Sequence, residues 1–322
     1  MSGPDGMGKG NLKVRLNKML INAAAAGLLL ACGFVEDLID NIDHFADENN
    51  NFQLGPDQGE EQSSIPVKGF IIQPVPARFD GFEDYFSQYI NVFGVHVFAS
   101  NDVPSRKILH AANILAEYLD NDQDGIPDDP NVIKEMRSVN AALVMFGTSH
   151  DLDSSGFLDQ DEIIDRIWMQ DLAGDEVIPG GSKNGEFDAS IEEVLHLISS
   201  AGWEQAYPKV FGARPGTLLG DRMDIARGGQ FMRVPDRYPK NAWYTYYDET
   251  CEYECQVSEY FYWALTSILG GQDFPGRLGE IREEWPLNTR EKVREGDPGI
   301  YQLLTDPKYN LPTNLPDGSY SP

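Results

Sequence analysis

The segment from Ser105 to Leu119, SRKILHAANILAEYL, carries the clearest fold signal in this 322-residue chain. Its apolar side chains recur every three or four residues, which is the spacing of one face of an α-helix. Ser105 can serve as the N-cap, because its hydroxyl can accept a hydrogen bond from a backbone N–H of the first turn. The segment therefore predicts an amphipathic helix over residues 105–119.

The sequence around this helix contains both strand and helix patterns. Three runs rich in Val, Ile, Ala and Phe predict strands: Val67–Val75, Val92–Ala99 and Ala142–Phe146. Three further segments repeat the helical period: Asp161–Leu172, Ser190–Gly202 and Gln256–Leu269. Because helices outnumber strands, we expect an α+β fold that is predominantly helical, with a small sheet and a Pro/Gly-rich C-terminal wrap.

The first 31 residues have the pattern of a secretory signal peptide. Four basic residues precede an apolar run, Leu20–Ala31, that is too short to span a bilayer. The sequence Leu29-Leu30-Ala31-Cys32-Gly33 resembles a bacterial lipobox, which implies lipidation of Cys32. A plain cleaved signal fits the pattern equally well. We therefore expect the chain to be secreted, or lipid-anchored on the outer side of a membrane.

Composition separates a linker from a folded body. Residues 32–65 are rich in Asp, Glu, Asn, Gln, Gly and Ser and predict an acidic flexible linker, whereas residues 66–322 predict a single domain. Hydrophobic residues make up 41% of the chain and aromatics 11%, which is too many for a disordered protein.

The charge of the chain bounds its partners. A net charge of −27 disfavours nucleic acid and anionic membrane surfaces, because bound phosphates need cations opposite them. Membrane contact is therefore expected only through an N-terminal lipid. Divalent metal ions are the expected ligands of so acidic a surface.

Two cysteines, Cys251 and Cys255, remain after Cys32. Cα atoms four residues apart can lie within bridging distance, and an exported protein meets an oxidising environment. The pair therefore predicts a local disulfide. A two-cysteine metal site is the alternative, but no second Cys or His pair lies nearby in the sequence.

Residues 151–162, DLDSSGFLDQDE, resemble the twelve-residue loop of an EF-hand. Oxygen donors stand at positions 1, 3 and 5, glycine at position 6, and a glutamate at position 12. Residues 141–150 predict a strand and turn instead of an entering helix, so we expect a calcium loop without a standard EF-hand pair. The resemblance implies these calcium ligands: Asp151, Asp153, Ser155, Phe157, Asp159 and Glu162.

A second acidic loop, Asp120–Pro130, resembles the D-x-D-x-D-G-x-x-D loops of thrombospondin type 3 and dockerin modules. Its four candidate calcium ligands are Asp120, Asp122, Asp124 and Asp128. Position 12 is Asn131, so the bidentate glutamate is missing and affinity should be lower. The alternative is a solvated acidic turn, although its carboxylates repel one another without a cation. Calcium here would stabilise the fold.

A candidate reactive site lies in the segment Ser190–Ile198, SIEEVLHLI. Glu192 and His196 are four residues apart, which places them on one face of the predicted helix. In the segment Val257–Leu269, Glu259 is the only charged residue among aromatic neighbours. Because a buried unpaired carboxylate is costly, Glu259 needs a cation, a metal ion or a proton.

These two segments resemble a family of metallopeptidases. The first matches the zincin motif H-E-x-x-H with the first His replaced by Glu. The second, Ser258–Ala264 (SEYFYWA), resembles the third-ligand helix of gluzincins of the anthrax-lethal-factor type. The resemblance implies that Glu192, His196 and Glu259 hold a metal ion and that Glu193 is the general base.

The resemblance also implies an oxyanion-stabilising tyrosine, for which Tyr244, Tyr246 and Tyr247 are the candidates and Tyr246 our choice. One imidazole with two carboxylates suits Mn²⁺ or Fe²⁺ as well as Zn²⁺. The alternative is structural: two glutamates near a helix start favour the helix dipole, and His196 packs between leucines. Of the other histidines, we expect His110 to be a satisfied core residue.

Together these features predict an exported, calcium-stabilised, metal-dependent hydrolase, best interpreted as a peptidase acting on peptides or proteins. One rival is a non-catalytic, calcium-dependent surface or adhesion protein in which the Glu192, His196 and Glu259 set is structural. A further rival is a protein that binds iron or manganese without hydrolysis.

Overall fold

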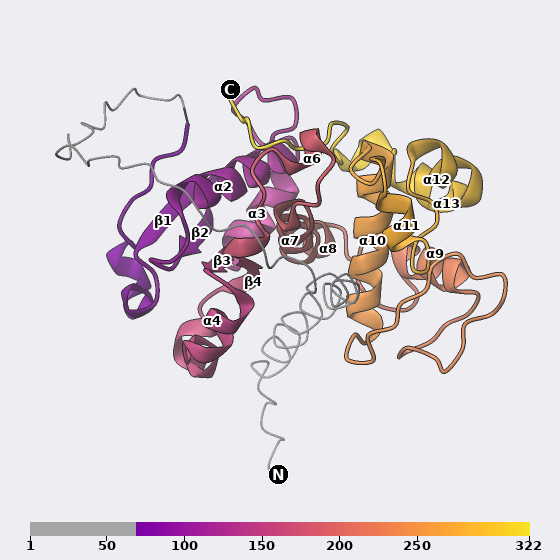
Figure 1. The fold of residues 1–322 in the computed structure, drawn as a ribbon, viewed down its shortest axis with the longest axis horizontal. Helices are drawn as coiled ribbons and strands as arrows, with labels where there is room; N and C mark the ends of the chain where they lie inside the picture. The colour runs from indigo at the N-terminus through magenta and orange to yellow at the C-terminus, as the bar shows by residue number, and fades with distance from the viewer. Residues whose placement is uncertain (1–68) are drawn as a thin grey trace, which may run out of the picture.

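A four-stranded mixed sheet forms one side of the protein in the computed structural model, which describes residues 69–322 apart from the side chains of Ser182 and Lys183 (Figure 1). The strands lie in the order β1-β2-β3-β4. Their bounds are Gln88–Val92, Val95–Ala99, Ala141–Phe146 and Trp168–Ala173. β1 and β2 pair antiparallel, whereas the other two pairs are parallel. The fold is α+β, as the sequence predicts.

Helices make up most of the remaining structure. The α-helices are α2 (Ser105–Leu119), α3 (Pro130–Ser138), α4 (Ser149–Ser154), α5 (Asp161–Ile164), α6 (Gly181–Asn184), α7 (Ala189–Ile198), α8 (Glu204–Ala206), α9 (Leu218–Arg227), α10 (Tyr253–Leu269), α11 (Arg277–Ile281), α12 (Arg290–Gly296) and α13 (Pro298–Leu304). A π-helical turn, η5 (Ser199–Trp203), continues α7. Short 3₁₀ turns are η1 (Ala77–Phe79), η2 (Phe82–Asp84), η3 (Phe157–Asp159), η4 (Gly174–Glu176) and η6 (Pro307–Tyr309).

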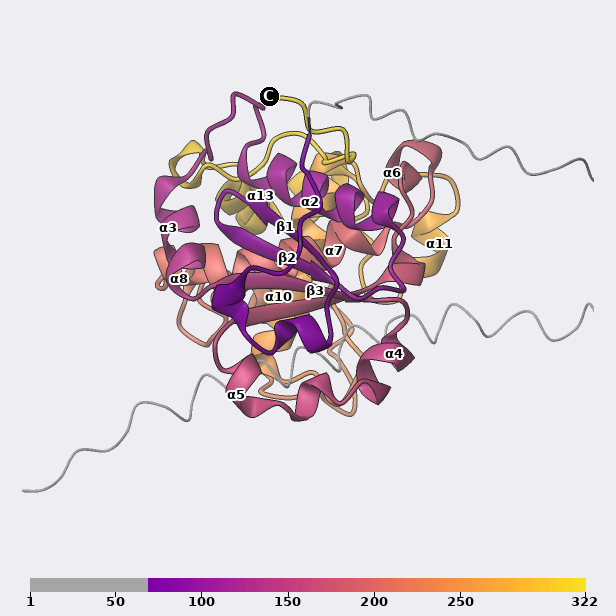
Figure 2. The ribbon, with the colours of Figure 1, turned by 90° about the vertical axis from the view of Figure 1, so that its left-hand side faces the viewer.

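The two faces of the sheet contribute to two different cores. Side chains alternate along a strand, so Leu143 and Met145 face the larger core with α2, α7 and α10, whereas Ala142 and Val144 face the other side. That other side is a cluster rich in phenylalanines, covered by η1, η2, η3 and α5. Figure 2 shows the sheet with α4 and α5 on one side and α2 and α7 on the other.

Helix α7 occupies the centre of the molecule. It packs against β3 and β4 on one side and contacts both α2 and α10 (Figure 1). Helix α10 in turn contacts α9, α12 and α13. The seam between α7 and α10 is therefore where the sheet half of the protein meets its helical half.

Three of the seven predicted elements are confirmed. The helix predicted over residues 105–119 has those bounds, although Pro104 occupies the N-cap position and Ser105 is the first helical residue. The predicted strand Ala142–Phe146 is β3, one residue longer. The predicted helix Gln256–Leu269 is α10, which begins three residues earlier, at Tyr253.

A fourth prediction, Ser190–Gly202, combines two elements. Residues 189–198 form α7, and the π-helical turn η5 carries the chain on to Trp203. Both are helical, so the periodic pattern located the segment correctly while missing its change of pitch at Ser199.

The remaining predictions need correction. The run Val92–Ala99 is split by a tight turn at Phe93 and Gly94, both with positive φ, so it supplies one residue of β1 and all of β2. In Val67–Val75 the described residues form a single bridge, Gln73 to Tyr89, and no strand. Residues 161–172 are helical only to Ile164, because the following Trp168–Ala173 segment pairs with β3 as β4.

The C-terminal segment wraps over α2, as predicted. The Glu117 carboxylate accepts hydrogen bonds from the backbone N–H groups of Asp317, Gly318 and Ser319.

The signal peptide, Cys32 and the acidic linker lie outside the described residues. Within residues 69–322, no helix is long and apolar enough to cross a bilayer.

Candidate metal centre

The N-terminus of α7 is fixed by Asp188, its N-cap. The Asp188 carboxylate accepts hydrogen bonds from the Ser190 backbone N–H at 3.2 Å and from the Ser190 hydroxyl at 2.8 Å. It also lies 2.7 Å from Nε2 of His110 on α2, which confirms His110 as a satisfied core residue. About two turns further along α2, the Tyr118 hydroxyl donates to the Ile191 carbonyl at 2.9 Å. Helix α2 therefore holds the first turn of α7 at two points.

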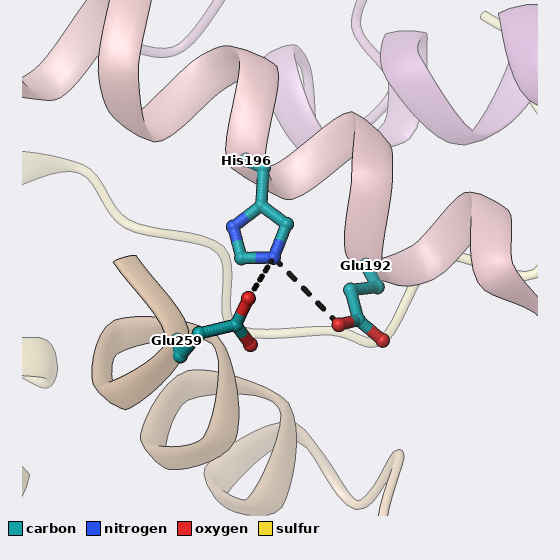
Figure 3. Close-up of side chains that lie close together, drawn as sticks. All are labelled: Glu192, His196 and Glu259. Carbon is teal, nitrogen blue, oxygen red and sulfur yellow. Dashed lines mark ion pairs between the residues drawn. The ribbon is translucent and has the colours of Figure 1, made fainter. Parts of the chain in front are cut away.

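The three predicted metal ligands come together in the seam between α7 and α10 (Figure 3). Nε2 of His196 lies 3.7 Å from Oε1 of Glu192 and 3.5 Å from Oε1 of Glu259. Hydrogen bonds of this type have lengths of about 2.7–3.2 Å, so both distances are too long. Two ligand atoms about 2.1 Å from one tetrahedral ion would lie about 3.4 Å apart. The spacing therefore fits three side chains arranged around one ion.

Burial strengthens this interpretation. The side chains of His196 and Glu259 are 6% and 8% exposed, whereas Glu192 is 19% exposed and marks the more open side. Neither ring nitrogen of His196 has a hydrogen-bond partner among the described residues. Because an unsatisfied buried polar atom costs about 1–3 kcal/mol, the imidazole calls for a partner that residues 69–322 do not supply, such as a water molecule or a metal ion.

The pKa shifts reflect this crowding. Burial lowers the pKa of His196, but the negative charges of Glu259 and Glu192 outweigh it, so the pKa rises overall. Burial raises the pKa of Glu259 to about 8, although His196 opposes the shift. Metal binding requires these ligands to lose their protons, so binding of a cation and loss of protons are coupled here.

Glu193, the predicted general base, lies on the neighbouring face of α7. It is buried, and its Oε2 accepts a hydrogen bond of 2.7 Å from the Gln170 side chain on β4. Burial raises its pKa well above the usual range, and Glu192, Asp171 and Glu259 add to the shift. Glu193 therefore belongs to the same electrostatic environment as the three ligands and is oriented by the sheet.

The candidate tyrosines have different surroundings. Tyr246 is buried, and its pKa is raised by burial and then by the charge of Glu259, while Tyr246 in turn lowers the pKa of Glu259, so the two side chains are neighbours. Tyr244 instead donates to the Gln256 carbonyl at 2.8 Å, and Tyr247 is 53% exposed. The structure therefore brings Tyr246, and neither of its rivals, to the candidate centre.

The segment that carries Tyr246 is held in several places. The Tyr238 hydroxyl donates to the Tyr246 carbonyl at 3.0 Å and accepts from its N–H at 3.1 Å. Cys251 and Cys255 form the predicted disulfide, with Cα atoms 5.3 Å apart, at the start of α10. Because both sulfurs are bonded to each other, a two-cysteine metal site does not form.

Sequence reasoning missed one carboxylate beside the site. Glu284 has a pKa raised to about 7, first by burial and then by Glu192. Its carbonyl accepts a hydrogen bond of 3.1 Å from the Thr245 N–H, next to Tyr246. No local motif surrounds Glu284, so only the pairing of residues 245 and 284 could reveal its position.

The loop Asp120–Pro130 keeps three of its four predicted ligands together. Carboxylate oxygens of Asp120, Asp122 and Asp124 lie within 4.8 Å of one another. Asp120 is buried and already accepts hydrogen bonds from the Gly125 N–H and the Tyr320 hydroxyl. Asp128 lies outside this group and accepts from the Asn121 N–H at 2.8 Å. Calcium binding by this loop stays a prediction.

The predicted EF-hand loop does not form. Residues 149–154 are helix α4, whose N-cap Thr148 exchanges hydrogen bonds with Asp151 at 2.7 and 3.1 Å. Phe157 is buried in the phenylalanine-rich core, which pulls the segment onto the sheet. Gly156 does adopt the positive φ expected of position 6. Within residues 69–322, however, none of the acidic positions joins a group that could hold an ion: Asp151, Asp153, Asp159 and Glu162.

Comparison with known proteins adds no assignment to this geometry. No family model matches the chain, and neither a curated protein nor a solved structure matches it. The likeness to gluzincins therefore rests on the motif residues of α7 and α10 alone.

Proposed function

We propose that this protein is a metal-dependent hydrolase, exported and stabilised by calcium, and that its substrates are peptides or proteins. One observation carries the metal site: the buried His196 ring has no hydrogen-bond partner among the described residues and directs Nε2 at two carboxylates. Export is proposed from the signal-like pattern of residues 1–31, with secretion or a lipid on Cys32 as the two outcomes.

Glu192, His196 and Glu259 would hold the ion. When bound, a divalent ion supplies Lewis acidity toward the scissile carbonyl and toward water. Glu193 would accept the proton of the attacking water at its carboxylate and later return it to the leaving amine. The Tyr246 hydroxyl would donate to the oxyanion that develops on the carbonyl oxygen, after leaving its contact with Glu259.

The donor set favours more than one metal. Structural and catalytic zinc sites in proteins are rich in nitrogen and sulfur, whereas carboxylates suit manganese and iron as well. A protein that binds iron or manganese without hydrolysis is therefore the second candidate function, supported by the two carboxylates and the single imidazole of this centre.

Metal analysis of protein purified without chelator tests the site. We expect one transition-metal ion per chain in the wild type and its loss in Glu259→Ala. Glu254→Ala is the matched control, because it changes a glutamate of the same helix outside the centre and should keep the metal. Calcium alone in the wild type would instead support the non-catalytic surface or adhesion protein.

Peptidase assays on the metal-loaded protein test the reaction. Glu193→Gln keeps the shape of the side chain and the Gln170 contact in part, so metal content should stay at one ion per chain while peptide cleavage falls by about 10²-fold or more. Metal retention without cleavage by the wild type would point to the iron- or manganese-binding protein.

A further inference from the structure

Arg277, at the start of α11, is buried among aromatic rings close to the candidate metal centre. Its guanidinium carbon lies 4.8 Å from the ring centroid of Phe187, 5.6 Å from that of Trp263 and 5.8 Å from that of Phe274. Only 8% of the residue is exposed. The three rings hold the guanidinium in place before any ligand arrives, which lowers the entropic cost of binding one.

The hydrogen-bonding capacity of this guanidinium is only partly used. Nε donates to Oε1 of Gln272 at 2.7 Å, and Nη1 pairs with Glu280 at 3.1 Å. The Glu280 side chain is 59% exposed, so this ion pair is weak. Nη2 makes no hydrogen bond to the described residues. Nη2 is not among the buried atoms without a partner, so Arg277 retains donor capacity at the accessible edge of an otherwise buried side chain.

Trp263 supplies a second donor without an acceptor. Its indole Nε1 is buried and has no partner among the described residues. An indole N–H that is buried normally finds an acceptor. The buried indole N–H without a partner lies beside a guanidinium that still has a donor group to spare, and together they indicate a place for an acceptor of negative charge.

The Trp263 donor stands one helical turn from the candidate metal ligand Glu259. Trp263 follows Glu259 by four residues on α10, so both lie on the same face. Tyr262 connects the two groups: its ring lies 5.7 Å from the His196 ring, and its hydroxyl accepts from Gln272 at 3.0 Å. Gln272 is the residue that also accepts from Arg277. The guanidinium also lowers the pKa of Glu284, which borders the centre.

We propose that Arg277 and the Trp263 indole form a carboxylate-binding subsite beside the metal centre and that the substrates carry a carboxylate near the scissile bond. A planar guanidinium matches a carboxylate with two parallel hydrogen bonds. The carboxylate is either the C-terminus of the peptide or an acidic side chain. This inference names the substrate class of the proposed hydrolase and rests on that function.

Peptide binding separates the two sources of the carboxylate. The probes are an acetylated tripeptide ending in phenylalanine as the free acid, the same peptide as its amide, and an acetylated tripeptide amide ending in glutamate. Binding is measured by calorimetry on metal-loaded Glu193→Gln protein, so that turnover does not consume the probe. We expect one carboxylate-bearing probe to bind about tenfold or more tightly than the phenylalanine amide.

Three variants identify the residues responsible. Arg277→Gln should abolish the preference for the carboxylate, and Trp263→Phe, which removes the indole N–H and keeps an aromatic ring, should reduce it several-fold. Arg282→Gln, at an exposed arginine just after α11, should leave it unchanged. Metal content and thermal melting confirm that each variant is folded. If Arg277→Gln does not fold, Arg277→Lys is the second variant. Lysine keeps the positive charge but lacks the two parallel N–H donors of the guanidinium, so the preference for the carboxylate probe should weaken.

Three results would each overturn the subsite. They are equal binding of the acid and the amide, no binding of either carboxylate probe, and a carboxylate preference that survives Arg277→Gln. Its failure is distinguishable from failure of the proposed function, because the binding measurement does not depend on cleavage. A wild type that cleaves peptides but ignores the carboxylate would keep the hydrolase and lose the subsite. A protein that prefers the acid but cleaves no peptide would keep the carboxylate subsite and lose the proposed hydrolase activity.

Discussion

Glu192 is the residue at which this site departs from zinc peptidases. It occupies the place of an imidazole in the H-E-x-x-H pattern and brings a hard oxygen and a negative charge to the centre. In the proposed site, it and Glu259 would give two anionic ligands to one divalent ion. Such a centre is formally neutral when filled, which favours metal binding but weakens the polarisation of water compared with a nitrogen-rich zinc site.

Changing Glu192 to His should shift the metal preference. Two imidazoles and one carboxylate are the ligand set of many zinc peptidases, so we expect zinc affinity relative to manganese to rise by about tenfold or more. Competition with a chromophoric chelator measures both affinities. The control Glu192→Gln removes the charge without adding a nitrogen ligand and should weaken both metals. Unchanged preference in Glu192→His would show that residue 192 does not contact the ion.

His96 on β2 gives a pH dependence that can be worked out. Burial first, and then Arg78, lower its pKa from 6.5 to about 4. Because the folded pKa lies below the unfolded one, stability is fully present above pH 6.5 and is lost as the pH falls toward 4. A shift of this size corresponds to a loss of about 3 kcal/mol over that window.

Urea denaturation between pH 7 and pH 4 checks this dependence. The variant His96→Gln does not titrate, so its stability deficit at pH 7 should shrink as the pH falls. His150→Gln, at an exposed histidine, should follow the wild type throughout. Parallel profiles for His96→Gln and the wild type would contradict the assigned pKa.

At the scale of elements, the position of α7 decides whether the ligands can meet. Its helical period, its N-cap Asp188 and its apolar faces are all local features. Its direction relative to α10 comes from packing against β3, β4 and α2. The local pattern therefore places Glu192 and His196 on one face, whereas the tertiary contacts turn that face toward Glu259.

Removing the cap of α7 should disturb both stability and the metal centre. Asp188→Ala deletes the cap and leaves the buried His110 without its partner, so we expect a loss of about 2–3 kcal/mol in the free energy of unfolding. Thr289→Ala removes the N-cap of α12, away from the centre, and should cost about 1 kcal/mol. Urea denaturation measures both. Metal affinity should fall only in Asp188→Ala; an equal fall in the control would contradict a specific role for α7.

At the scale of the whole molecule, the acidic loop Asp120–Pro130 joins distant parts of the chain. It begins at the end of α2, and Asp120 also accepts from Tyr320 in the C-terminal wrap. The same end of α2 carries Glu117, which anchors the wrap, and Tyr118, which contacts α7. An ion in this loop would therefore stabilise the protein well beyond its own residues.

Calcium should raise the melting temperature, because it binds the folded loop and relieves repulsion among Asp120, Asp122 and Asp124. We expect a rise of several degrees in calcium over EGTA, measured by calorimetry, and its loss in Asp124→Asn. Asp153→Asn, in the segment that does not form an EF-hand loop, should keep the full calcium shift. If calcium does not shift the melting temperature of the wild type, it does not stabilise this fold. If Asp153→Asn loses the shift as fully as Asp124→Asn, calcium also binds at residues 151–162.

Local patterns were enough for α2, α7 and α10, for the spacing of Glu192 and His196, and for the disulfide, because each depends on neighbours within a few residues. They were misleading where a buried surface outweighed propensity. Residues 168–173 pair with β3 instead of extending a helix, and Phe157 draws the EF-hand-like segment into a core.

Only the tertiary structure decided what surrounds the metal ligands. Glu259 reaches His196 across 63 residues of sequence, and Tyr246, Arg277 and Glu284 arrive from three further segments. Side-chain periodicity is a property of one helix and can be read along the chain. The angle at which two helices cross is set by the packing of all their buried neighbours, so no single stretch of sequence contains it.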